Sequence, residues 1–246
     1  MSGYRLIALD MDGTLLDEDK KISAENKAAI QQATEEGFIV MMSTGRGVIS
    51  ALPFVRELGL NTPMVMVNGS EVWSSPDTLL QRTHLDIAIV EKLHQLALEQ
   101  DCWWWAYSEE GVFNREKEEL DLREQKWLKF GFFTENEAKL ERIRDIVTRW
   151  DNTEITNSHP ANLEMNPKGV SKASGIAAVC KLLGISMSEV IAVGDSENDM
   201  AMIREAGLGV AMGNAQERVK AMADFVTKTN EESGVAHVIR EYMLKK

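Results

Sequence analysis

Residues 4–14 read YRLIALDMDGT, an apolar run followed directly by a polar turn. The run at 4–9 has the length and composition of a buried strand in a parallel sheet. It ends at Asp10, and Asp12 and Gly13 follow in what we expect to be a tight loop. Open α/β sheets bind ligands beyond the carboxyl ends of their strands. This stretch therefore predicts both a fold class and the place of a site.

The alternation of strand and helix continues at both ends of the chain. Ser23 is a suitable N-cap for the first helix and Gly37 a suitable end, whereas Pro53 either kinks the second helix or marks its start. The pattern predicts a doubly wound, mostly parallel α/β sheet. We expect strands at 38–43, 63–69, 190–195, 208–213 and 225–226, and helices at 23–37, 48–57, 171–183, 198–206, 215–223 and 235–243.

The middle of the chain, residues 83–166, has a different character. We interpret it as a small α+β domain inserted into the doubly wound one, which comprises residues 1–82 and 167–246. The charged run at 109–124 suggests a solvated helix with its turn. Other elements expected in the insertion are helices at 86–100 and 135–150, a strand at 103–107, and a polar strand pair at 154–157 and 162–166.

Each apolar strand ends in a polar group, and these ends should meet at one crevice. Several carboxylates placed close together either raise one another's pKa or bind a cation. Oxygen ligands beside a phosphate favour a hard ion, which here suggests Mg²⁺. The residues brought to this crevice are Asp10, Asp12, Thr44, Asn68, Asp195 and Asp199.

Such a crevice suits the transfer of a phosphoryl group. Asp10 can attack phosphorus and form an acyl phosphate, while Asp12 is close enough to exchange a proton with the leaving alcohol. The hydroxyl of Thr44 and the N–H of Gly45 can hold phosphate oxygens. Lys172, at a predicted helix start, can supply the remaining positive charge.

Four motifs together resemble the haloacid dehalogenase superfamily, and more narrowly its Cof-like sugar-phosphatase branch. They occur in the family's order along the chain, and the inserted segment matches the position and type of the family's cap. The resemblance implies a Rossmann-like catalytic core with a cap that selects the substrate. The motifs are DMDGTL at 10–15, STGR at 43–46, PKGVSKASGI at 167–176 and GDSENDMAM at 194–202.

The family's functional residues can be carried onto this chain at the matching positions. One departure is Ala173, where the family usually has glycine, and it leaves Lys168 as an alternative to Lys172. The resemblance implies that Asp10 is the nucleophile and a Mg²⁺ ligand, and that Asp12 is the acid/base and binds the metal through its backbone carbonyl. It implies that Asp195 completes the metal site, with Asp199 as a supporting or additional ligand. The residues implied to bind phosphate are Met11, Thr44, Gly45, Lys172 and Asn198.

Two alternatives to a phosphatase share this chemistry. A phosphomutase on the same core would return the phosphate to its product. A receiver-like signalling module would hold the phosphate without turnover, but such modules are shorter and lack the insertion. Within the insertion, Trp103 and Trp105 should share one face of a strand and Trp104 the other. We expect at least one of these faces to pack in the cap core; the alternative for the other face is a position above the substrate.

The composition of the chain limits the classes of molecule that it is expected to bind. The formal net charge of −12 disfavours nucleic acid as a partner. No signal peptide and no run of about 20 apolar residues is present, so a cytoplasmic enzyme without a membrane partner is expected. Cys102 and Cys180 suggest reduced, buried thiols. The expected partner is a small phosphorylated metabolite, while its identity and the oligomeric state stay open.

Overall fold

The computed structural model describes residues 3–116 and 121–245. Its central sheet is parallel throughout, in the order β13-β12-β11-β1-β2. Strand β1 lies between β2, from the N-terminal part of the chain, and β11, from the C-terminal part. This arrangement confirms the doubly wound sheet. The strands are β1 (Leu6–Leu9), β2 (Ile39–Met42), β11 (Val190–Gly194), β12 (Leu208–Ala211) and β13 (Phe225–Val226).

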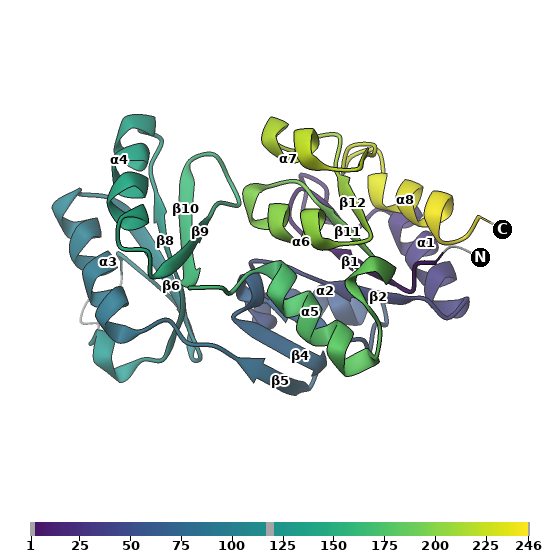
Figure 1. The fold of residues 1–246 in the computed structure, drawn as a ribbon, viewed down its shortest axis with the longest axis horizontal. Helices are drawn as coiled ribbons and strands as arrows, with labels where there is room; N and C mark the ends of the chain where they lie inside the picture. The colour runs from purple at the N-terminus through teal and green to yellow at the C-terminus, as the bar shows by residue number, and fades with distance from the viewer. Residues whose placement is uncertain (1–2, 117–120, 246) are drawn as a thin grey trace.

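Helices cover both faces of this sheet (Figure 1). Ile7 and Leu9 of β1 are buried in a core that includes side chains of α1, α2 and α8. Leu6 and Ala8 point the other way, into a second core with α5. The helices are α1 (Ala24–Glu35), α2 (Val48–Glu57), α5 (Lys172–Leu183), α6 (Met200–Glu205), α7 (Glu217–Met222) and α8 (Gly234–Tyr242), with short 3-10 helices at Met187–Glu189 (η3) and Glu197–Asp199 (η4).

The signals at helix ends act largely as expected. The hydroxyl of Ser23 accepts a hydrogen bond from the N–H of Asn26 at 3.1 Å and caps α1. Gly37, just beyond that helix, has a φ of 88°, a conformation that favours glycine. Helix α2 begins at Val48, five residues before Pro53. The proposal that Pro53 marks the helix start is therefore wrong.

The third predicted strand belongs mainly to another sheet. β3 (Met64–Met66) pairs antiparallel with β4 (Glu71–Ser75), which pairs with β5 (Thr78–Arg82). A single parallel bridge between Ser43 and Val65 joins β3 to the end of β2. The β4–β5 hairpin was not predicted. A short 3-10 helix, η1 (Val67–Gly69), separates β3 from β4 and contains Asn68 with a φ of 56°.

The middle of the chain forms the expected α+β unit. Its antiparallel sheet has the order β7-β6-β8-β10-β9, and α3 and α4 cover the face that is turned away from the rest of the molecule (Figure 1). We refer to this unit as the cap. Its elements are α3 (Ile87–Glu99), β6 (Trp103–Ser108), β7 (Gly111–Asn114), η2 (Leu122–Glu124), β8 (Trp127–Phe133), α4 (Glu137–Thr148), β9 (Thr153–Thr156) and β10 (Asn162–Pro167).

One expectation inside the cap fails, and one strand was overlooked. The solvated helix at 109–124 is wrong where the structure describes it, because Gly111–Asn114 form the edge strand β7 and only η2 is helical. Residues 117–120 lie outside the described residues. Charge density alone favoured a helix there, but pairing with β6 determines the local structure. Strand β8, the central strand of the cap sheet, was not predicted at all.

The expected buried thiols and the expected facing of the tryptophans are confirmed. Cys102 and Cys180 are both buried and free. Trp104 is buried in the cap core and stacks on Phe130 with ring centroids 5.4 Å apart, whereas Trp103 and Trp105 lie on the opposite face of β6. Among the residues described, no helix has both the length and the apolar character needed to cross a membrane.

Candidate active site

Asp10 stands at the carboxyl end of β1. Its backbone N–H donates to the carbonyl of Val193 at 3.0 Å, which continues the sheet, and its carboxylate is almost fully buried. The following turn passes close to Asp195. A Cβ on Gly13, whose φ is 77°, would lie 2.6 Å from an Asp195 oxygen, so this approach requires glycine. Thr14 donates its hydroxyl proton to Asp195 Oδ1 at 3.1 Å.

Asp12 is held by two cations. Arg46 donates Nε and Nη2 to its carboxylate at 2.6 and 2.7 Å, and Lys20 adds a third bond at 2.9 Å. Partial burial alone would raise the pKa of Asp12, but hydrogen bonds from Arg46 and Lys20 outweigh this and lower that pKa to about 2. In this arrangement Asp12 is ionised. Met11 buries its side chain in the core, so only its backbone can contribute to the site.

Thr44 and Gly45 follow β2 and face the same crevice. The hydroxyl of Thr44 accepts from the N–H of Arg46 at 3.2 Å, which leaves its proton able to donate. A Cβ on Gly45 would lie 2.9 Å from Asn68 Oδ1. The absence of a side chain thus lets this loop pass beside Asn68.

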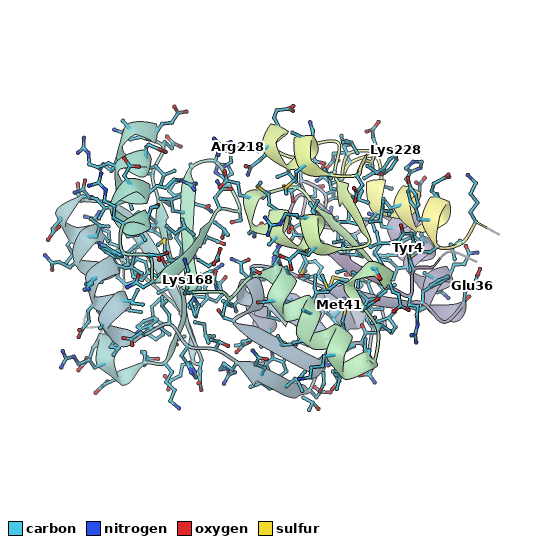
Figure 2. All side chains as sticks on the ribbon, in the orientation of Figure 1. Tyr4, Glu36, Met41, Lys168, Arg218 and Lys228 are labelled. Atoms are coloured by element: carbon cyan, nitrogen blue, oxygen red, sulfur yellow. The ribbon has the colours of Figure 1, made fainter. Side chains whose placement is uncertain are left out.

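Lys172 reaches the nucleophile candidate from the first turn of α5. Its Nζ lies 2.6 Å from Asp10 Oδ1 and 2.6 Å from Asp199 Oδ1, with the side chain fully buried. Burial opposes its charge, but Asp10 and Asp199 raise the pKa of Lys172 above its usual range, so it stays protonated. Lys168, labelled in Figure 2, is exposed and pairs with Asp151 instead. The structure therefore places Lys172, and not Lys168, at the crevice.

The loop after β11 carries Asp195, Asn198 and Asp199. Asp199 already uses both oxygens, because Oδ2 accepts from the N–H groups of Asp195 and Ser196 while Oδ1 accepts from Lys172. Asn198 donates Nδ2 to Asn68 Oδ1 at 3.2 Å, and its own Oδ1 is buried without a hydrogen-bond partner within the described structure. Asn198 is also one of the residues that line the crevice.

Three carboxylates form a candidate metal site. Oxygens of Asp10, Asp195 and Asp199 all lie within 4.8 Å of one another. Burial raises the pKa of Asp10 well above its ordinary value; Lys172 opposes this shift, and Asp199 and Asp195 add to it. Burial and Asp199 likewise raise the pKa of Asp195 to about 6. A cation would relieve this crowding, and an all-oxygen set fits a hard metal ion.

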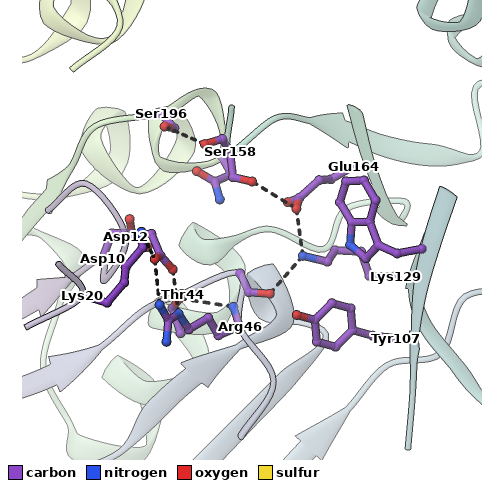
Figure 3. Close-up of a pocket in the computed structure, with 13 residues that line it drawn as sticks. Asp10, Asp12, Lys20, Thr44, Arg46, Tyr107, Lys129, Ser158, Glu164 and Ser196 are labelled. Carbon is purple, nitrogen blue, oxygen red and sulfur yellow. Dashed lines mark hydrogen bonds and ion pairs between the residues drawn. The ribbon is translucent and has the colours of Figure 1, made fainter. Parts of the chain in front are cut away.

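The cap closes the other side of the crevice (Figure 3). A cavity of about 260 Å³ lies between the two units. Lys129 of β8 donates to Glu164 Oε1 at 3.0 Å and to the carbonyl of Gly45 at 2.9 Å, and both side chains are buried. The residues that line the cavity are Asp10, Asp12, Lys20, Thr44, Gly45, Arg46, Trp105, Tyr107, Lys129, Ser158, Glu164, Ser196 and Asn198.

Sequence reasoning selected the core residues and missed most of the cap residues. The structure brings together every candidate selected from the motifs, although their chemical roles stay predictions. Lys129 was missed because β8 was missed. Glu164 is likewise buried, and it joins cap to core through Asn68, whose Nδ2 donates to Glu164 Oε2 at 2.7 Å. The facing of Trp105 could be predicted from strand alternation alone.

Comparison with known proteins identifies this arrangement. The pattern of the haloacid dehalogenase-like hydrolases matches residues 7–130 and 113–239. The chain belongs to this family. Its resemblance to the Cof-like branch is confirmed, and it is a phosphatase of the haloacid dehalogenase type.

Relatives and solved structures match almost the full chain. A 5-amino-6-(5-phospho-D-ribitylamino)uracil phosphatase of Bacillus subtilis is 42% identical, covering 98% of this chain and 96% of that protein. A second phosphatase of the same name from that organism is 33% identical, covering 96% and 97%. A solved haloacid dehalogenase-like hydrolase from B. subtilis superposes with a TM-score of 0.90 at 26% identity, covering 97% of this chain and all of that one.

Proposed function

We propose that this phosphatase hydrolyses a small phosphate monoester through a phosphoaspartate on Asp10. The observation that supports this most strongly is the convergence of Asp10, Asp12 and Lys172 with the Thr44–Gly45 loop in one crevice. We also propose that residues 1–82 and 167–246 act as the catalytic core, that residues 83–166 act as the cap, and that the enzyme works in the cytoplasm.

The reaction has two steps in this proposal. In the first, an Asp10 carboxylate oxygen bonds to phosphorus, the bond from phosphorus to the ester oxygen breaks, and Asp12 gives its proton to the departing alcohol. In the second, Asp12 takes a proton from water, whose oxygen bonds to phosphorus as the bond to Asp10 breaks. Phosphate then leaves, and both aspartates are regenerated.

Asp12 must be protonated for the first step, yet its ion pairs with Arg46 and Lys20 favour the carboxylate. A substrate phosphate is a competing anion for both cations. We therefore propose that substrate entry draws Arg46 or Lys20 away from Asp12 and raises its pKa toward the range of a general acid. Lys172 keeps its place beside Asp10 and offsets the added negative charge.

We propose Mg²⁺ as the metal. Asp10, Asp195 and the backbone carbonyl of Asp12 would hold it, and when bound it supplies positive charge beside the transferring phosphoryl group. Asp199 would support the site without direct coordination, because Lys172 and two backbone N–H groups already occupy its oxygens. The same carboxylates are the ones whose pKa values are raised in its absence.

For the substrate we propose 5-amino-6-(5-phospho-D-ribitylamino)uracil. Two relatives that match nearly the full chain carry this activity in their names. The cavity between core and cap also has an anion-binding end at Lys20 and Arg46 and an aromatic, hydrogen-bonding end at Trp105 and Glu164. A phosphorylated polyol that ends in a planar ring has the same two-ended character.

The test is release of free phosphate from this ester by the purified protein with Mg²⁺. Many turnovers per enzyme are expected, and Asp10→Asn should lower the rate by about a thousand-fold or more while circular dichroism stays unchanged. Transfer of phosphate to another hydroxyl would indicate a mutase, and a stable phosphoprotein without turnover a receiver-like module. Retained activity in Asp10→Asn would contradict the assignment of the nucleophile.

A further inference from the structure

The open face of the cap sheet carries a row of three residues across its central strands. Trp105 of β6 is opposite Gly131 of β8, and Gly131 is opposite Glu164 of β10. Residues opposite one another on adjacent strands point to the same face of a sheet. Trp105 and Glu164 also line the cavity that contains Asp10. The row therefore faces the leaving-group end of the proposed reaction.

Gly131 determines where the indole of Trp105 lies. A Cβ built on Gly131 would collide with the six-membered ring of that indole, so the ring rests on the backbone of β8. Trp103 supports it from the same strand, with ring centroids 5.7 Å apart and an angle of 33°. Trp105 lines the cavity, whereas Trp103 is not among its lining residues. A firmly held aromatic surface thus borders the site.

Glu164 adds a hydrogen-bond acceptor beside this surface. A carboxylate can accept about four hydrogen bonds. Within the described chain three are used, from Lys129 and Ser158 on Oε1 and from Asn68 on Oε2. Lys129 is itself occupied by Glu164, by the carbonyl of Gly45 and by the ring face of Tyr107 at 4.8 Å. Glu164 therefore retains the capacity to accept a further hydrogen bond.

We propose that this row recognises the heterocycle of the substrate: Trp105 stacks on a pyrimidine ring, and Glu164 accepts a hydrogen bond from its amino or ring N–H group. This inference rests on the proposed function and names the residues that select its substrate. A planar ring with N–H donors satisfies both the aromatic surface and the spare acceptor. An open-chain polyol phosphate satisfies the acceptor but has no planar ring to stack on the indole.

The experiment compares two esters that share the phosphate and the polyol. One is 5-amino-6-(5-phospho-D-ribitylamino)uracil, and the other is ribitol 5-phosphate, which lacks the ring. The ratio of their kcat/KM values is measured for the wild type, Trp105→Leu and Trp105→Phe. Trp103→Leu is the matched control, since it makes the same change on the same strand face outside the cavity. Leucine keeps apolar volume, and unfolding midpoints check that each variant folds.

If Trp105 stacks on the ring, its replacement should lower kcat/KM selectively for the ring-bearing ester. Trp105→Leu should lower the ratio by about ten- to one-hundred-fold, because the loss of stacking falls mainly on the ring-bearing ester. Trp105→Phe should restore much of the ratio, and Trp103→Leu, which removes only a supporting ring, should lower it far less than Trp105→Leu does. An unchanged ratio in Trp105→Leu, or an equal loss on both esters, would overturn the inference alone. A wild type that does not favour the ring-bearing ester would instead overturn the proposed substrate, before any variant is considered.

Discussion

At the scale of single residues, Lys172 is the buried cation that pairs with the acidic crevice. It is fully buried and neutralises two carboxylates, those of Asp10 and Asp199. Lys172→Met would leave both without their cation, and breaking a buried ion pair costs about 3–5 kcal/mol. We expect the metal-free variant to lose stability on that order in urea unfolding, and activity to fall at least about a hundred-fold.

Lys168→Met provides the matched control, because this lysine lies four residues away and is exposed beside Asp151. Its ion pair is solvated, so we expect no measurable change in activity. Similar losses in the two variants would contradict the placement of Lys172 at the nucleophile. The sequence alone left these two lysines as alternatives, since both precede or begin the same helix. Only the three-dimensional path of α5 separates them.

Asp195 gives the metal-free protein a pH dependence. Its pKa is raised to about 6 in the folded state, from an ordinary value of 3.8. A raised folded pKa means that the folded protein holds the proton more tightly, so this contribution to stability is full below about pH 4 and is lost as pH rises through 6. In EDTA, the urea midpoint of the wild type relative to Asp195→Asn should therefore fall between pH 4 and 7.

Mg²⁺ should reverse that trend, because ligands must be deprotonated to bind it. The stabilisation that Mg²⁺ gives the wild type should be larger at pH 7.5 than at pH 5, and largely absent in Asp195→Asn. Equal stabilisation of the two proteins at pH 7.5 would speak against Asp195 as a ligand. The same titration in Ca²⁺ shows how much of the effect is general charge neutralisation.

At the scale of elements, the start of α5 fixes the position of Lys172. Ser171 caps this helix by accepting from the N–H of Ser174 at 3.2 Å, and Ser174 Oγ accepts from the Ser171 N–H. Ser171→Ala should lower the free energy of unfolding by about 1 kcal/mol. Ser186→Ala, which removes the cap of the short helix η3, is the control that should leave kcat unchanged.

A comparison of kinetics tests the role of the Ser171 N-cap. If this serine positions Lys172, Ser171→Ala should also lower kcat several-fold, whereas Ser186→Ala should not. A stability loss in Ser171→Ala without any change in kcat would restrict the Ser171 N-cap to a structural role. Both variants are measured in the same buffer with saturating metal.

Elements were predictable where local pattern and tertiary role agree. Helices α1 and α2 and strands β1, β2 and β11 have apolar runs and capping residues that match their final burial. Strand β8 could not be predicted, because Lys129 and Gly131 interrupt its apolar run. Both residues are accommodated by contacts with segments that lie elsewhere in the chain. The charge of Lys129 is paired by Glu164, 35 residues away, and Gly131 makes room for Trp105.

At the scale of the whole molecule, a buried ion pair of the cap is also hydrogen-bonded to the core. Lys129 and Glu164 both belong to the cap, but Lys129 also donates to the core at Gly45, and Glu164 accepts from the core at Asn68. Either Lys129→Met or Glu164→Leu alone should destabilise the protein by about 3–5 kcal/mol, because a buried charge is left unpaired. Urea unfolding measures this.

The double variant Lys129→Met/Glu164→Leu separates stability from function. Buried ion pairs can often be replaced by apolar residues without loss, so we expect the double variant to regain most of the stability. Its kcat/KM should remain low, because the cap has lost its contacts with Gly45 and Asn68. Recovery of both stability and activity would indicate that the pair matters only for folding. This cap–core contact could not be predicted from local sequence, since it joins four segments that are far apart in the chain.

The central claim is that Asp10 becomes phosphorylated during turnover. The most direct measurement is to acid-quench the reaction in the steady state, reduce the protein with borohydride and analyse its peptides by mass spectrometry. Borohydride converts an acyl phosphate on aspartate to homoserine. We expect homoserine at position 10 in the wild type with substrate, and none without substrate or in Asp10→Asn. Rapid turnover without any homoserine at position 10, or with homoserine at another aspartate, would contradict the account.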